Sequence, residues 1–553
     1  MIPRRDPNDV MRLSRLGSLH QCRLSFMRQL TRRMADEAWQ ITRPRFDVDA
    51  SGVGVAIYRV FTGTRAYSLV AFAHDLPADQ RSDRVIATAW DATFTLFDGD
   101  PTDADIDRLR KAVPVQEAGR ITDRELTLSR ANRSVRLWTH VIDALAAGRQ
   151  PDRAQIDAVG YLMRTTAVYG SGKFGAADRD VIADRSEFEA PFQAEMLTVY
   201  LIRVFVRDLV NQMARSKNPH AVPLAPEIAQ RLGIGNSTGL GMAPFLMNHP
   251  DLINNWIMVR EEALSRVRSQ PSATSDQVSL FKDLWARNAA LMADWTSSHP
   301  LQMERLTELH ADIALLTGRL ANFDFDQNRA WDALYHLASD RGEDAQEMLA
   351  SLMLEPFGDL VDGLACCMAA PMGTKPALNG QMSVQALRRI IQDHMSWCLN
   401  TDWTEADETA RVWYTSVEKL EPRLGERAEE PLDPYEQPLA PGRDIASAHA
   451  ALMHWPDEET TAAFLMKHPE HRHAVRRIQH LTHAPYGEIR DNTISADMLP
   501  IDLLRAKLSF FGATHFDPRS DRWVRICMYA GAPYPEDLSP ETADFWIYPK
   551  GAV

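Results

Sequence analysis

The chain has few cysteines, no long hydrophobic run and no excess of positive charge. Its five cysteines among 553 residues, none in a CxxC spacing, are typical of a reduced cytoplasm rather than of a disulfide framework. We expect the adjacent Cys366 and Cys367 to be small buried residues rather than a redox pair. No segment approaches 18 uninterrupted apolar residues, and the N-terminus lacks the apolar core of a signal peptide. We therefore expect a soluble, cytoplasmic protein without a membrane span.

The charge balance narrows the range of partners. A net charge of −14 does not supply the basic field that a general nucleic-acid surface needs, so we expect no nucleic-acid partner. Residues 4–33 are locally different, because they contain eight arginines. They predict an amphipathic docking helix with a solvated basic face, and a membrane-surface or transit role is the alternative.

The chain also lacks the motifs of several large enzyme classes, including the G-x-S-x-G elbow and H-E-x-x-H. Residues 170–175, GSGKFG, resemble the G-x-G-x-F-G loop of protein kinases, but the kinase V-A-I-K, H-R-D and D-F-G motifs are missing. A Walker A motif fails because Ala167 and Phe174 occupy its glycine and Ser/Thr positions. The charged residues after Gly175 do not predict the βαβ unit of a dinucleotide site. No nucleotide signature survives, and the cofactor is unknown.

Local patterns predict a mainly α fold with a small antiparallel β-sheet, of the α+β class. Residues 52–76 predict a β-hairpin and residues 85–97 a third strand, which together form an N-terminal β-meander. Residues 122–147 predict a helix, with Thr122 and Glu125 as its capping box. Residues 191–216 are apolar almost all round and predict a central buried helix of a large helical core. A C-terminal hairpin is predicted around residues 517–521, and it could join the first sheet.

These elements suggest four parts of the chain. Residues 1–120 hold the basic helix and the small sheet, and residues 121–420 form the helical core with both glycine-rich segments. Residues 421–442 contain five prolines among carboxylates and predict a semi-rigid linker. Residues 443–553 form a histidine-rich helical segment that ends in the hairpin.

Two glycine-rich segments predict the position of a ligand site. Residues 170–175 and 233–241 hold seven of the 27 glycines. Backbone amides in such loops can bind an anion, and the second segment leads into an expected helix N-terminus. We expect a soluble enzyme that binds a small carboxylate- or phosphate-bearing substrate between the two segments, with its reaction unassigned. The expected substrate-binding residues are Arg164, Tyr169, Gly170, Gly172, Gly175, Asn236, Ser237, Thr238 and Gly239.

Two residues are the catalytic candidates of this hypothesis. Lys173 is one of only nine lysines among 61 basic residues, and a lysine ammonium can lose its proton when it is desolvated. His249 is the nearest histidine to the second segment and could transfer a proton, although a helix N-cap role explains it better. It belongs to a nine-residue pattern at 243–251 that recurs at 462–470.

The alternatives come from a histidine cluster and from the helical pattern. Seven of the 17 histidines lie within residues 449–483, and the spacing of His468 and His471 suits a metal-dependent enzyme. The neighbouring arginines Arg472, Arg476 and Arg477 would repel a cation, so the leading hypothesis includes no metal. A non-catalytic helical scaffold or interaction protein is the third hypothesis, and a homo-oligomer is compatible with all three.

Overall fold

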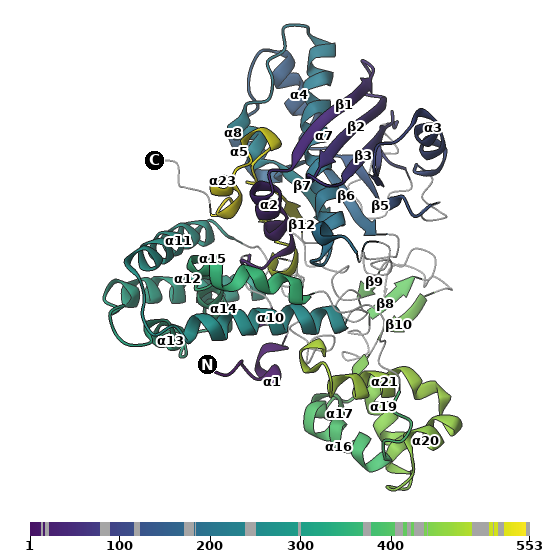
Figure 1. The fold of residues 1–553 in the computed structure, drawn as a ribbon, viewed down its shortest axis with the longest axis vertical. Coiled ribbons are helices and arrows are strands. Elements are labelled where there is room, and N and C mark those ends of the chain that lie inside the picture. The colour runs from purple at the N-terminus through teal and green to yellow at the C-terminus, as the bar shows by residue number, and fades with distance from the viewer. Residues whose placement is uncertain are drawn as a thin grey trace.

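The computed structural model describes most of the chain. The described residues are 1–12, 15–16, 21–77, 89–114, 122–170, 182, 184–237, 250–296, 300–368, 378–403, 413–416, 422–424, 436–439, 441–488, 508–512, 514–517 and 525–548. A large sheet with its covering helices adjoins a body of helices, and a smaller group of helices lies at the far end (Figure 1).

The sheet has nine strands and both parallel and antiparallel pairs. Hairpins connect β1 to β2 and β2 to β3, and β4 and β5 continue the antiparallel order. The C-terminal hairpin completes the sheet, since β12 pairs with β7. In spatial order, the strands are β1 (Gln40–Val48), β2 (Gly54–Phe61), β3 (Ala66–Ala73), β4 (Ala92–Asp98), β5 (Glu125–Arg133), β6 (Tyr161–Gly170), β7 (Gly233–Ser237), β12 (Arg525–Met528) and β11 (Thr514–Asp517).

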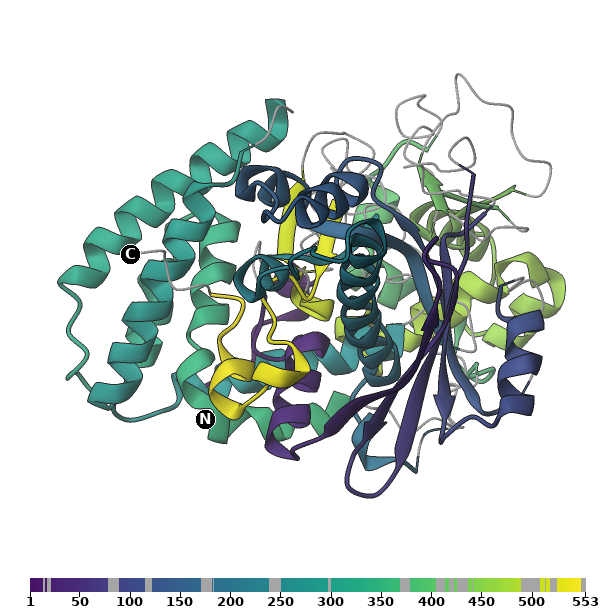
Figure 2. The same cartoon turned by 90° about the horizontal axis from the view of Figure 1, so that it is seen from above.

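Helices cover both faces of this sheet (Figure 2). On one face, α7 (Gln193–Lys217) packs against β3, β5 and β6, and most of its first 14 residues are fully buried. On the other face, Ile106 and Leu109 of α3 (Asp103–Ala112) pack against apolar residues of β2 and β3. Burial on both faces explains why the central strands contain so few exposed polar residues.

The predicted fold class, a mainly α protein with a small antiparallel sheet, is therefore wrong. Both predicted hairpins and the buried helix α7 exist, but they belong to one large mixed sheet and its cover. The predicted helix at 122–147 begins with a strand, β5, and is helical only from Trp138 in α4. Thr122 donates its backbone N–H and its hydroxyl to the Glu125 carboxylate, at 2.6 and 2.9 Å, but Glu125 is the first residue of β5, so the pair lies at the start of a strand rather than capping a helix.

The helical body shares one hydrophobic core with the sheet. Trp256 and Trp331, both fully buried, lie within the part of that core that the helices provide. Its helices are α10 (Pro250–Arg268), α11 (Ser275–Ala293), α12 (Pro300–Ala321), α13 (Ala330–His336), α14 (Glu343–Leu352), η3 (Glu355–Phe357), α15 (Gly358–Val361) and η4 (Asp362–Met368). Shorter helices elsewhere are α1 (Pro7–Val10), α4 (Trp138–Ala146), α5 (Arg153–Val159), η2 (Ser186–Phe188), α8 (Pro226–Arg231), η7 (Pro535–Asp537) and α23 (Pro540–Asp544).

Several of the N-terminal arginines are buried rather than solvated, contrary to the prediction, whereas Arg4 and Arg12 are exposed. Arg28 of α2 (Phe26–Asp36) is fully buried and forms a two-pronged ion pair with Glu355, at 2.5 and 2.8 Å. Arg23 pairs with Asp362 at 2.6 Å and with Asp544 at 3.0 Å. The basic segment therefore joins the helical body to the C-terminal residues, and its charge is used inside the protein.

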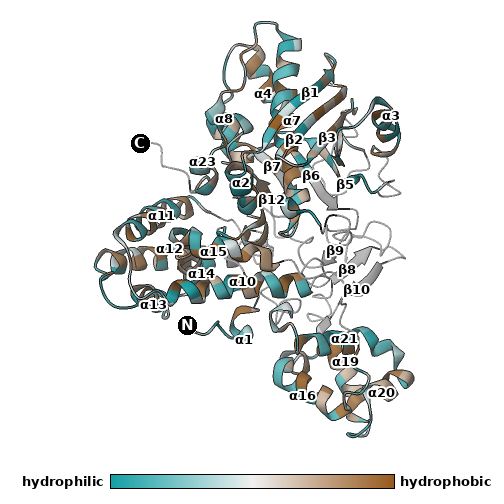
Figure 3. Ribbon diagram, viewed as in Figure 1, coloured by the Kyte–Doolittle hydropathy of each residue, from teal (hydrophilic) through white to brown (hydrophobic). Residues whose placement is uncertain are grey.

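A separate group of helices, which we call the C-terminal helical unit, has its own hydrophobic core. Its ribbons alternate between hydrophilic and hydrophobic residues, as expected for amphipathic helices (Figure 3). It contains α16 (Val384–His394), α17 (Ser396–Leu399), α19 (Pro441–Met453), α20 (Thr461–Lys467), η5 (Pro469–His471) and α21 (Arg472–Leu481), with η6 (Pro485–Gly487) leading out of it.

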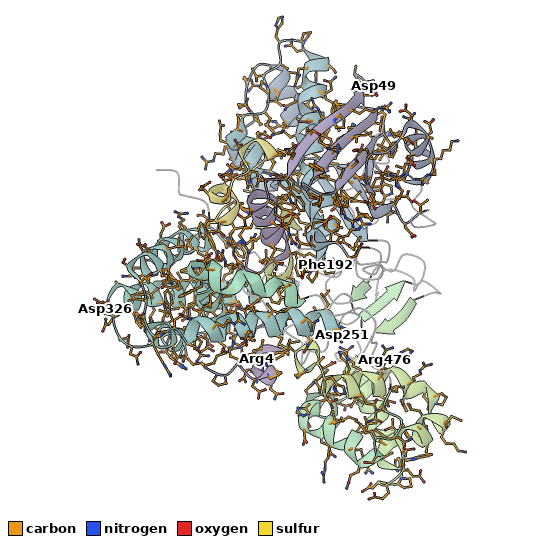
Figure 4. The ribbon with its side chains drawn as sticks, viewed as in Figure 1. Arg4, Asp49, Phe192, Asp251, Asp326 and Arg476 are labelled. Atoms are coloured by element: carbon orange, nitrogen blue, oxygen red, sulfur yellow. The ribbon has the colours of Figure 1, made fainter. Side chains whose placement is uncertain are left out.

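The C-terminal helical unit meets the helical body at the start of α10. His480 lies 3.0 Å from Asp251, and Arg477 pairs with Glu488 at 2.7 Å. Figure 4 shows Asp251 and Arg476 at this junction. Part of the predicted linker forms a small sheet in which β8 (Trp413–Ser416) lies between β9 (Pro422–Leu424) and β10 (Glu436–Leu439). No helix in the described ranges is long and apolar enough to cross a membrane.

Candidate functional site

The two glycine-rich segments overlap neighbouring strands of the large sheet, since Gly170 ends β6 and residues 233–237 are β7. Strands β6 and β7 pair in parallel, with Arg164 opposite Gly235 and Thr165 opposite Asn236. Helix α7 connects them across one face of the sheet (Figure 1). Because parallel strands end at the same edge, Gly170 and Ser237, the last residues of β6 and β7, both point the chain towards that edge.

This crossover is a βαβ unit, which the charged residues after Gly175 did not predict. Its helix in the described part of the chain, α7, begins at Gln193, well after Gly175. Arg203 of α7 fixes the entry to β7, since its guanidinium donates to the carbonyls of Leu232 at 2.7 Å and Gln230 at 3.1 Å.

The strands end at different heights along the shared edge. Strand β7 ends at Ser237, one residue after the Thr165–Asn236 pair, whereas β6 continues for five residues to Gly170. At about 3.3 Å per residue, Gly170 at the end of β6 lies about 13 Å beyond Ser237 at the end of β7, measured along the strand direction. A ligand that touches both segments must therefore lie beside the last residues of β6, where the predicted Tyr169 and Gly170 are placed.

Three polar side chains are buried where the two strands pair. Arg164, Thr165 and Asn236 are each at most 5% exposed. The Asn236 amide donates to the Thr165 hydroxyl at 3.3 Å, so the two strands are linked by side chains as well as by the backbone. Buried polar groups are costly unless they are hydrogen-bonded, and here they lie within the paired strands, with Asn236 inside the second glycine-rich segment.

Two of the glycines that defined the second segment have a packing role. A Cβ atom at Gly235 would lie 2.6 Å from the Tyr161 ring, and one at Gly233 would lie 2.4 Å from the Met528 carbonyl oxygen. Both glycines are in strand β7 rather than in a loop. Close packing between β6, β7 and β12 therefore explains them without a ligand.

Residues next to η2 add charged groups at the same edge, and sequence reasoning missed them. Strand β4 runs in the direction of β6, so its last residue, Asp98, lies at this edge. Arg185 donates to Asp98 at 2.8 Å, and the Tyr67 hydroxyl donates to Glu187 at 2.5 Å. Burial is the main cause that raises the pKa of Tyr67, and the hydrogen bond to Glu187 is the second. The hydroxyl therefore stays protonated and can act as a donor. These partners are far apart in sequence, so no local pattern could indicate them.

Arg185 is the best-placed cation of that group. Its side chain is 7% exposed, and its Nε and Nη1 atoms have no hydrogen-bond partner within the described part of the chain. The Arg185 guanidinium is therefore held in a fixed position, with two nitrogen donors that have no described partner, at the edge of the sheet where β6 ends.

The remaining predicted site residues cannot be compared with the structure. Tyr169, Gly170 and Ser237 are described as strand backbone only. Six others lie outside the described residues: Gly172, Lys173, Gly175, Thr238, Gly239 and His249.

The histidines of the metal hypothesis lie close together, far from this edge. His468, Glu470 and His471 present three possible ligand atoms that all lie within 4.8 Å of one another. They belong to η5 of the C-terminal helical unit. The cysteine expectation is wrong, since Cys366 and Cys367 are both exposed and their sulfur atoms are 3.8 Å apart.

Comparisons with known proteins add no assignment. No family model matches the chain, and neither the curated proteins nor the solved structures include a significant match.

Proposed function

We propose that the shared edge of β6 and β7 binds a small molecule bearing a carboxylate or phosphate group. The observation that carries the proposal is the parallel pairing of β6, which ends at the first glycine of one segment, with β7, which forms the first five residues of the other. The ligand would lie between residues 170–175 and residues 238–241, beside the last residues of β6.

The direction of the connections supports this position. After β6 the chain returns over the sheet through α7, whereas after β7 it continues to α10 in the helical body. Ligands of open sheets commonly bind outside the carboxyl ends of parallel strands, where successive connections diverge in this way. Because β6 and β7 run towards the same edge, their pairing favours a shared site over the scaffold hypothesis.

The available charges agree with an anionic ligand. In this proposal, backbone amides of both segments, Lys173 and Arg164 provide the positive potential, and Asn236 with its neighbours Ser237 and Thr238 orients the ligand. Arg185 adds a further cation whose donors are not all used. Lys173 is also the proposed general acid or base and His249 a second proton-transfer group, which would make the protein an enzyme of unassigned reaction.

Thermal unfolding in the presence of anions tests the proposal. We would titrate the full-length protein with inorganic phosphate and with succinate, against sodium chloride at matched ionic strength. A ligand at one hundred times its Kd stabilises the folded state by about 2.7 kcal/mol, so binding raises the midpoint in a concentration-dependent way. At least one of the two anions is expected to do so.

A matched pair of lysine variants then locates the site. Lys173→Ala is expected to lose most of the anion-dependent rise, while Lys111→Ala, on the exposed last turn of α3, keeps it. If neither anion stabilises the protein beyond chloride, or if both variants respond equally, the proposal is wrong.

A further inference from the structure

The turn between α20 and α21 holds two imidazoles around one carboxylate. His468 Nδ1 lies 3.2 Å from a Glu470 carboxylate oxygen, and His471 Nε2 lies 3.9 Å from the same oxygen. A tetrahedral zinc ion with bonds of about 2.1 Å needs ligand atoms about 3.4 Å apart, so both measured distances are close to that requirement. The widest separation, within 4.8 Å, closes by small rotations of partly exposed side chains.

Aromatic packing holds both imidazoles in place. The fully buried Phe464 stacks on His468 with ring centres 5.0 Å apart and on His471 at 5.9 Å with an interplanar angle of 6°. Trp455 meets the His468 ring edge-on at 5.6 Å. Because Phe464 belongs to the core of the C-terminal helical unit, the two rings are fixed to that core rather than left to move freely. Such preorganisation lowers the entropy that a metal ion must overcome to bind.

The repulsion that the sequence indicated is reduced at one of the three neighbouring arginines. Arg477 is occupied by Glu488, with a nitrogen–oxygen distance of 2.7 Å. Asp444 of α19 interacts electrostatically with His471 and adds a second negative charge on that side. Arg443 partly offsets Asp444, since the two side chains are 3.6 Å apart.

We propose that His468, Glu470 and His471 bind a divalent cation of the zinc type. Two imidazoles and a carboxylate are a common ligand set for Zn²⁺ and neighbouring transition metals. Glu470 has a side chain that is 59% exposed, so the site opens to solvent and leaves at least one coordination position for water or another ligand. The site is independent of the sheet edge and of the anion proposed there.

The test uses tag-free, full-length protein and measures metal binding directly. We would titrate Zn²⁺ by calorimetry and follow Co²⁺ by its visible absorption, which is strong only in a low-coordinate site. The wild-type chain is expected to bind about one equivalent. His471→Ala and Glu470→Gln are each expected to weaken binding at least tenfold, and circular dichroism checks that both variants fold.

Two controls separate this site from other metal-binding groups. His473→Ala removes an exposed histidine two residues away and is expected to leave the affinity within twofold. Cys366→Ser/Cys367→Ser removes the exposed thiol pair and is likewise expected to change nothing. The proposal is overturned if the wild type binds less than a tenth of an equivalent. It is also overturned if the thiol variant loses the metal while Glu470→Gln keeps it.

Discussion

Glu347 of α14 should be one of the most important carboxylates for stability. It is fully buried and accepts hydrogen bonds from Arg5 at 2.5 Å and from Arg260 at 2.7 Å. Burial by itself would raise the pKa of Glu347, but the charges of Arg5 and Arg260 outweigh it and lower the pKa from 4.5 to about 2. Since each pKa unit corresponds to about 1.4 kcal/mol, the ionised carboxylate contributes about 3 kcal/mol to the free energy of unfolding at neutral pH.

The predicted perturbation is Glu347→Gln, which keeps the shape and removes the charge. We expect urea unfolding at pH 7, followed by tryptophan fluorescence, to show a loss of about 3 kcal/mol, because breaking one side of a buried ion pair leaves the other charges uncompensated. The lowered pKa sets the sign of the pH dependence. The stabilisation is complete above pH 5 and is lost as the pH falls towards 2, so at pH 3 the difference from wild type should be roughly halved.

Glu343→Gln is the matched control on the same helix. Its carboxylate is 32% exposed and lies 3.5 Å from Arg15 and 3.8 Å from Arg12, so we expect a loss below about 1 kcal/mol. The reasoning is refuted if Glu347→Gln costs no more than Glu343→Gln, or if its cost is the same at pH 7 and pH 3.

Two further predictions concern glycine packing and thiol exposure. Gly235→Ala should destabilise the protein by about 1–3 kcal/mol, because the new Cβ would meet the buried Tyr161 ring. Gly318→Ala, on the exposed last turn of α12 with no atom within 4 Å of a Cβ, should stabilise it by about 0.5–1 kcal/mol; equal urea midpoints for the two variants would contradict this account. Maleimide labelling of the native protein, read by mass spectrometry, should modify only Cys366 and Cys367, and early modification of any buried cysteine would contradict the described burial.

The sequence predicted the elements whose pairing is local. The hairpin of β2 and β3 joins strands separated by a short turn, so alternation and turn residues suffice to detect it. Helix α7 is long and apolar enough to be recognised by itself. The size of the sheet could not be predicted in the same way, because β7 pairs with strands more than 60 residues earlier and almost 300 residues later. Its glycines also reduce its own β propensity.

The candidate site likewise combines features that a local sequence pattern predicts with features that depend on distant parts of the chain. Composition selected the two glycine-rich segments, but only the parallel pairing of β6 with β7 directs the two strands to one edge of the sheet. The charged groups around Arg185 come from three distant parts of the chain, and the buried partner of Arg28 is 327 residues away. Ion pairs of this kind leave no periodic signal, which is why the N-terminal arginines seemed to form a solvated face. The histidine turn was detectable because all three of its ligand candidates lie within four residues.

Hydrogen–deuterium exchange tests the central claim, a shared anion site, most directly. The full-length protein would be compared with and without whichever of phosphate and succinate gives the larger thermal shift. If one ligand contacts both segments, peptides covering residues 166–175 and peptides covering residues 237–245 should both exchange more slowly when it is bound. Protection of only one segment, or of neither, would contradict a site between them.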